Sequence, residues 1–223
     1  MQKKVLGALA GLFALLQAAT FTQSGGPPKA AIDITDEEVK AVLKHTPPST
    51  DRQLRIVDMG TYNLAVGVIH RGPTGAGPGA GGGRGGAAGG GAARGATAAP
   101  QPCGRSVPGG APGGLGGLYH DHTVETYIIT SGSGTLVTGG EILNGRRSDP
   151  ESQVTTILNG PSCSGTIGGN PVRRVVKPGD IIIIPEGVPH GWTDIKDHVT
   201  YLSVRPDPNK VLQTGYVHPA INK

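Results

Sequence analysis

The segment from residue 179 to residue 190 restricts the fold more than any other part of the chain. Four consecutive isoleucines at 181–184 are followed by Pro185 and Gly187, and His190 comes three residues later. A short apolar run bounded by turn residues is typical of a core strand, because proline and glycine leave a β-ladder at a turn. The segment therefore predicts a strand, a turn and an imidazole that returns to the end of the strand.

A second segment, at residues 119–125, contains His120, His122 and Glu125. Successive side chains of a strand point to opposite faces, so His120 and His122 should share a face, about 7 Å apart. The odd offset turns Glu125 to the other face unless a turn or bulge intervenes. Imidazoles with a carboxylate on such scaffolding are a ligand set for a divalent transition metal, with positions left open for substrate.

The two segments resemble the paired motifs of the cupin superfamily. The residues that match are Gly114, His120, His122, Glu125 and Gly132 in the first motif, and Gly179, Pro185, Gly187 and His190 in the second. Two departures stand out: only two residues separate His122 from Glu125, where the family has three or four, and Asp194 replaces the family's Asn. The resemblance covers roughly residues 53–206 and implies an all-β fold, the cupin-type double-stranded β-helix or jelly-roll barrel.

The resemblance also implies one bound divalent transition metal, with His120, His122, His190 and Glu125 as ligands. Mn, Fe, Ni, Cu and Zn all suit these donors, so the sequence leaves the identity of the metal open. Cupins with three histidines and a glutamate include manganese oxalate oxidases, copper or iron flavonol dioxygenases and nickel or iron acireductone dioxygenases. Glu125 is expected to act as a ligand or base, and Tyr127, which shares its face, as a hydrogen-bond donor to the substrate or to Glu125.

These features predict a metal-dependent oxidoreductase of the dioxygenase or oxidase type, acting on a small organic acid, a phenolic compound or a sugar. Two other classes stay open. One is a non-redox metal-dependent isomerase or lyase, and the other is a cupin that binds a small ligand without turnover. The similarity to cupins further implies a homodimer.

The N-terminus has the pattern of a secretory leader. Two early lysines precede an apolar run at residues 5–16, and small residues follow it. We therefore expect a signal peptide at 1–22, a secreted or periplasmic protein, and no membrane partner after the leader is removed. Cys103 and Cys163 are compatible with one disulfide in such a compartment, but the sequence does not show that they meet.

The charge balance gives little support for nucleic-acid binding. The chain has 20 Lys and Arg residues against 16 Asp and Glu residues, and two of the lysines lie in the predicted leader. The mature chain would be nearly neutral, whereas binding to nucleic acid needs a concentrated basic face. No nucleic-acid partner is expected.

Composition divides the rest of the chain. An N-terminal arm at 23–52 contains one short helix, for which Thr35 and Glu38 supply a capping box. The barrel at 53–206 is interrupted at 72–117 by a Gly, Ala and Pro tract that cannot bury enough apolar surface to stay ordered. A tail at 207–223 follows. Strands are expected at 54–58, 63–70, 126–130, 134–138, 154–158, 172–176, 181–184 and 199–204, with a tight hairpin at 131–133 and a loop at 161–170.

Overall fold

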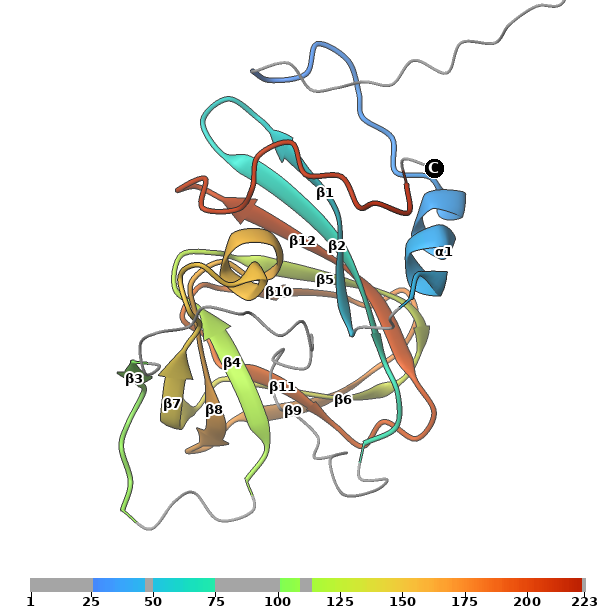
Figure 1. Ribbon diagram of the computed structural model, residues 1–223. Coiled ribbons are helices and arrows are strands. Elements are labelled where there is room, and N and C mark those ends of the chain that lie inside the picture. Colours follow the sequence, from blue (N-terminus) through green and yellow to red (C-terminus); the bar gives the residue numbers. More distant parts are fainter. Residues whose placement is uncertain (1–25, 47–49, 75–100, 109–113, 222–223) are drawn as a thin grey trace, which may run out of the picture.

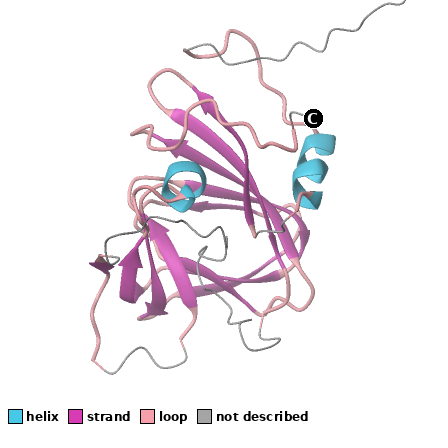
Figure 2. Ribbon diagram, viewed as in Figure 1, coloured by secondary structure: helices cyan, strands magenta, loops and turns pink. Residues whose placement is uncertain are grey.

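The computed structural model describes residues 26–46, 50–74, 101–108 and 114–221, and most of its regular structure is β (Figures 1 and 2). The predicted signal peptide and most of the predicted insertion lie outside these residues. The strands are β1 (Asp51–Asp58), β2 (Asn63–Arg71), β3 (Pro102–Cys103), β4 (Gly116–His120), β5 (Glu125–Gly132), β6 (Gly134–Thr138), β7 (Glu141–Arg147), β8 (Ser162–Gly168), β9 (Val172–Val176), β10 (Ile181–Ile184), β11 (His190–Thr193) and β12 (Val199–Asp207). A helix α1 (Asp36–Lys44) precedes them, and a π-helical turn η1 (Val154–Leu158) lies between β7 and β8.

The strands form two facing antiparallel sheets (Figure 1). One has the order β1-β2-β12-β5-β10, and the other has the order β3-β7-β8-β4-β11-β6-β9. The inner sets β2-β12-β5-β10 and β4-β11-β6-β9 have the strand order of a jelly roll, in which the chain passes back and forth between two sheets. The predicted fold class, an all-β double-stranded β-helix with a short N-terminal helix, is confirmed.

Side chains from both sheets pack into one core between them. Its members include Ile129, Leu136, Ile182, Ile184, Trp192 and Tyr201. The isoleucine strand β10 buries only alternate residues, since Ile181 and Ile183 are 63% and 68% exposed. The reason is that, among the described strands, β10 lies at the edge of its sheet and pairs with β5 alone, so only one of its faces meets the opposite sheet.

The predicted hairpin at residues 131–133 is wrong, because β5 and β6 belong to different sheets. The chain crosses between the sheets at Gly132, whose φ is 71°. A Cβ at this position would lie 2.0 Å from the carbonyl oxygen of His198, so glycine is required by both its conformation and its surroundings.

Two further local predictions between β7 and β9 are also wrong. Residues 154–158 form η1 instead of a strand, because Thr155 and Thr156 donate to the carbonyls of Asp149 and Ser152 and hold the chain in a turn. The region predicted as a loop contains β8, which pairs with both β4 and β7. Small polar residues hide this strand in the sequence, and neighbouring strands stabilise it.

Cys103 and Cys163 form a disulfide that joins β3 to β8, with their Cα atoms 6.1 Å apart. This settles the pairing that the sequence left open. Both β3 and the start of β4 fall inside the range predicted as a disordered insertion, so order extends further into that range than composition indicated.

The two ends of the described chain pack on the outer face of the β1-β2 hairpin. The predicted capping box of α1 is present, with Glu38 N donating to Thr35 Oγ1 at 3.2 Å. Val42 of α1 packs on Leu54 and Val68. The tail returns along β1, where Ile56 N donates to the carbonyl of Tyr216 at 2.9 Å. None of the helices in the described residues has the length and apolar character needed to span a membrane.

Candidate metal centre

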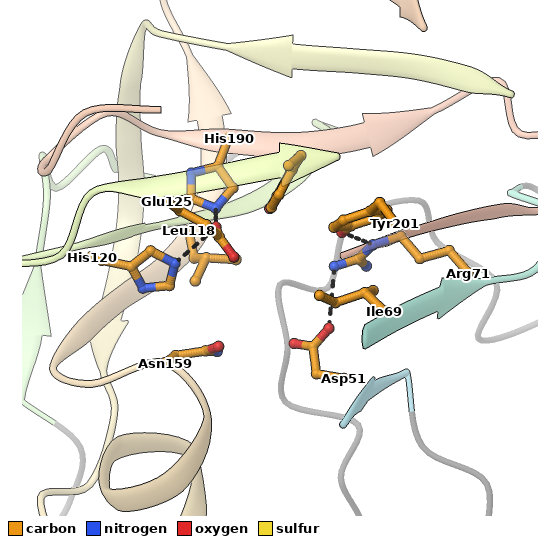
Figure 3. Close-up of a pocket in the computed structure, with 10 residues that line it drawn as sticks. Asp51, Ile69, Arg71, Leu118, His120, Glu125, Asn159, His190 and Tyr201 are labelled. Atoms are coloured by element: carbon orange, nitrogen blue, oxygen red, sulfur yellow. Dashed lines mark hydrogen bonds and ion pairs between the residues drawn. The ribbon is translucent and has the colours of Figure 1, made fainter. Parts of the chain in front are cut away.

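Three buried side chains meet between the two sheets: His120 at the end of β4, Glu125 at the start of β5 and His190 at the start of β11 (Figure 3). Each is at most 3% exposed. One ligand atom from each lies within 4.8 Å of the other two. The group therefore joins two residues that are five positions apart to a third that lies 65 positions further along the chain, with donors from both sheets.

The strand expected to carry His120 and His122 together ends at His120. Asp121 N donates to the carbonyl of Pro161, and the carbonyl of His120 accepts from Gly187 N, so the backbone here bonds to loops. A bend over residues 121–124 follows, and β5 then begins with Glu125 facing inward. This is the intervening turn that the sequence required if Glu125 was to join the histidines.

His122 is exposed and lies outside the group. The expectation that it shares a face with His120 is wrong, because that expectation assumed a continuous strand. Asp121 pairs with Arg147 and also lies outside the group. Among the described residues, the structure thus brings together two histidines and one glutamate in place of three histidines and one glutamate.

The hydrogen-bond partners of the two histidines set which nitrogen carries the hydrogen when each ring is neutral. His190 Nδ1 lies 3.0 Å from the carbonyl oxygen of Val188, which can only accept, so Nδ1 carries the hydrogen. His120 Nδ1 lies 2.9 Å from Ser162 Oγ, whose own hydrogen is donated to the carbonyl of Gly160. In each neutral ring the Nε2 lone pair is then directed toward the group.

These lone pairs face an oxygen atom. Glu125 Oε2 lies 3.2 Å from His120 Nε2 and 3.3 Å from His190 Nε2. Burial lowers the pKa of His120 and so favours its neutral form. When both rings are neutral with their hydrogens on Nδ1, three acceptors face one another without a hydrogen between them, and a cation at their centre removes the repulsion. Two ligands about 2.1 Å from one ion are about 3 Å apart when they subtend a right angle, which the observed separations fit.

The other oxygen of Glu125 is held from behind. Oε1 accepts from Ser203 Oγ at 2.6 Å and from Arg205 Nε at 2.9 Å. Burial raises the pKa of Glu125, but the charge of Arg205 and the contacts with the two histidines outweigh it and hold the pKa well below its ordinary value. The carboxylate therefore stays ionised, with Oε2 turned toward the histidines.

Sequence reasoning missed Ser203 and Arg205. Their signal is the period of two along β12, which places Ser203 and Arg205 on the same face as buried Tyr201. An arginine on the inward face of a strand requires a buried partner. The sequence offers no pairing rule that identifies Glu125, which is 80 residues away, as that partner.

Tyr127 faces the same side as Glu125, as predicted, and lines the pocket beside the group. Its ring lies edge-on to His190, with ring centroids 6.2 Å apart. Burial and the negative charge of Glu125 raise the pKa of the Tyr127 phenol well above its ordinary value. The hydroxyl therefore remains protonated and able to donate.

The pocket is small, about 10 Å³, roughly the space of one water molecule or ion. The group of His120, Glu125 and His190 lines one side of it, while Asp51, Arg71 and Tyr201 from the five-stranded sheet line the other (Figure 3). Asn159, just after η1, closes a third side. The chain is thus a jelly-roll protein with a buried candidate metal centre inside the barrel.

No family model and no curated protein matches the sequence. A Klebsiella pneumoniae protein with a double-stranded β-helix domain is 16% identical, with a TM-score of 0.37, and the match covers 81% of this chain and 94% of that one. A Bacillus halodurans protein is 13% identical, with a TM-score of 0.37 and coverage of 87% and 93%. Oxalate oxidase in complex with glycolate is 13% identical, with a TM-score of 0.32, and the match covers 74% of this chain and 55% of the oxidase chain.

Proposed function

We propose that this protein is a metal-dependent oxidoreductase that binds one divalent transition metal through His120, Glu125 and His190. The observation that carries the proposal is the convergence of two imidazole lone pairs and one carboxylate oxygen on a single buried point. A donor set of two histidines and one carboxylate with open positions is typical of mononuclear non-haem iron(II) oxygenases. Iron(II) is therefore the first metal to test, ahead of Mn, Ni, Cu and Zn.

The bound metal would supply Lewis acidity and a redox centre at which substrate and O2 bind. The side chains of this chain have separate tasks. Arg205 and Ser203 keep Glu125 ionised and oriented. Tyr127 lines the pocket, and its hydroxyl would donate a hydrogen bond to a bound ligand, while the apolar core beneath it would exclude water.

We further propose that the protein is secreted or periplasmic, with its leader at residues 1–22 removed. The disulfide between Cys103 and Cys163 supports this, because disulfides persist in oxidising compartments. N-terminal sequencing of the protein recovered from culture medium or periplasm tests the cleavage point.

Two measurements test the proposed activity. Elemental analysis of protein purified without added metal should find about one equivalent of a transition metal, and O2 consumption should follow when iron-loaded protein meets its substrate. The variants H120A and H190A should lose both the metal and the O2 consumption. A matched exposed control, H122A, should keep both. Full metal content in folded H120A/H190A would rule the site out.

Turnover by the metal-loaded protein without O2 would favour the isomerase or lyase class. The zinc-loaded protein supplies that comparison, since zinc polarises carbonyls without redox chemistry. Ligand binding without any product would favour the non-catalytic class.

A further inference from the structure

The pocket has a second charged wall, opposite the candidate metal centre. Ile69 of β2 pairs with Asp51 of β1 on one side and with Tyr201 of β12 on the other. Arg71 lies two residues beyond Ile69 and so shares its face, which is the inner face of the five-stranded sheet. The register of three strands therefore directs Asp51, Arg71 and Tyr201 into the same pocket as Glu125 (Figure 3).

Arg71 is fixed in place by its contacts with Tyr201 and Asp51, and the N–H groups of its Nη atoms are available to a ligand. Its Nε donates to the Tyr201 hydroxyl at 2.9 Å, and its Nη2 lies 3.9 Å from Asp51 Oδ1, an ion-pair distance too long for a direct hydrogen bond. Its side chain is 17% exposed. The only hydrogen bond that Arg71 makes to the described residues through its side chain is the one from Nε. Guanidinium has five N–H groups in a rigid fork, so the N–H groups on the Nη atoms remain for a ligand.

The charge of this wall is permanent. Burial favours a neutral side chain, but Tyr201 and Asp51 outweigh it and raise the pKa of Arg71 above its ordinary value. Arg71 is balanced by Asp51, and Arg205 is balanced by Glu125. A divalent cation at the metal centre therefore leaves the pocket with an excess of positive charge that an anionic ligand neutralises.

We infer that Arg71 binds the carboxylate of a small organic acid whose other end reaches the metal centre. Of the organic acid, phenolic and sugar classes, this selects the acid, because a planar guanidinium fork matches a carboxylate and a neutral ring offers it no charge. The pocket has room for only about one water molecule as it stands, so its side chains must move apart when the acid binds. The inference rests on the proposed metal site for its second anchor, while the Arg71 anchor stands on its own geometry.

The test compares malonate with malonamide, which has a similar shape but no charge. Dissociation constants are measured by titration calorimetry with zinc-loaded protein, and zinc content is measured separately. R71Q should raise the Kd for malonate roughly ten- to hundredfold, as loss of a charged hydrogen bond does, and should leave the Kd for malonamide unchanged. D51N, which removes a competing negative charge, should lower the Kd for malonate several-fold. R173Q, at an exposed arginine of β9, serves as the control and should match the wild type.

The outcomes separate the two claims. If zinc binds and folded R71Q binds malonate as tightly as the wild type, the inference is overturned and the metal site stands. If no zinc binds, but malonate raises the melting temperature of metal-free wild type and not of R71Q, the Arg71 site stands and the metal site fails. Should R71Q not fold, D51N decides, since an unchanged Kd for malonate in D51N overturns the inference.

Discussion

The guanidinium of Arg205 donates to Glu125 Oε1 across 2.9 Å, and both side chains are almost fully buried. Arg205 also donates to Leu158 and Asn159 at the end of η1. One arginine thus connects the acidic ligand of the candidate metal centre to the turn that closes the pocket.

We expect R205M to destabilise the metal-free protein by about 3–5 kcal/mol, because it leaves a buried carboxylate without the arginine that balances its charge. Urea unfolding followed by circular dichroism measures this. The matched control is R105M, which removes the exposed pair between Arg105 and Glu141 and should cost about 1 kcal/mol or less. Equal losses in the two variants would contradict the role given to Arg205.

The stability of the metal-free protein should depend on pH through Glu125. Its pKa in the folded protein is well below the ordinary value of 4.5, so the unfolded chain takes up the proton first as the pH falls. Glu125 therefore contributes its full stability above pH 4.5, and the contribution is lost as the pH drops below that value. E125Q cannot titrate, and its unfolding free energy should fall less steeply between pH 5 and pH 3. Parallel curves for the two proteins would exclude this linkage.

S162A should weaken metal binding about ten- to hundredfold without removing a ligand. Ser162 accepts from His120 Nδ1 and so holds the ring with its Nε2 lone pair inward. Competition with a chelator measures the affinity. S164A lies two residues along the same strand and should retain wild-type affinity, as Ser164 pairs with Leu118 and not with a ligand. Equal affinity in both variants would mean that the ring needs no such support.

Removing the disulfide with C103A/C163A should destabilise the protein by up to about 4 kcal/mol, as expected for a cross-link that closes a loop of this length. The two cysteines are 60 residues apart in the chain. Chemical denaturation should give the same lowered unfolding free energy for the variant and for the wild type measured in reductant. A variant as stable as the oxidised wild type would show that pairing among β3, β7 and β8 is sufficient.

The sequence was most informative where several short-range signals agreed. Thr35 and Glu38 identified α1, and the isoleucine run with Pro185 and Gly187 identified β10 and placed His190 at the site. Two motifs in the correct order were enough to predict the jelly roll. These features depend on residues close in sequence, whose spacing carries the geometry directly.

The prediction failed where long-range contacts decide the local conformation. His122 points to solvent because β4 ends at His120, where the backbone of His120 and Asp121 bonds to loops at Gly187 and Pro161. The sequence alone does not reveal those partners. The same applies to β8, whose polar residues become a strand only between β4 and β7.

The ligands of the candidate centre come from opposite walls of the barrel: β4 and β11 on one side, β5 on the other. An ion held there cross-links the two sheets. Release of the ion then requires the two sheets to separate locally, so the rate of metal exchange should be limited by this opening of the barrel and not by the metal–ligand bonds alone. Amide hydrogens at the start of β5 should exchange with solvent at the same slow rate at which the ion leaves.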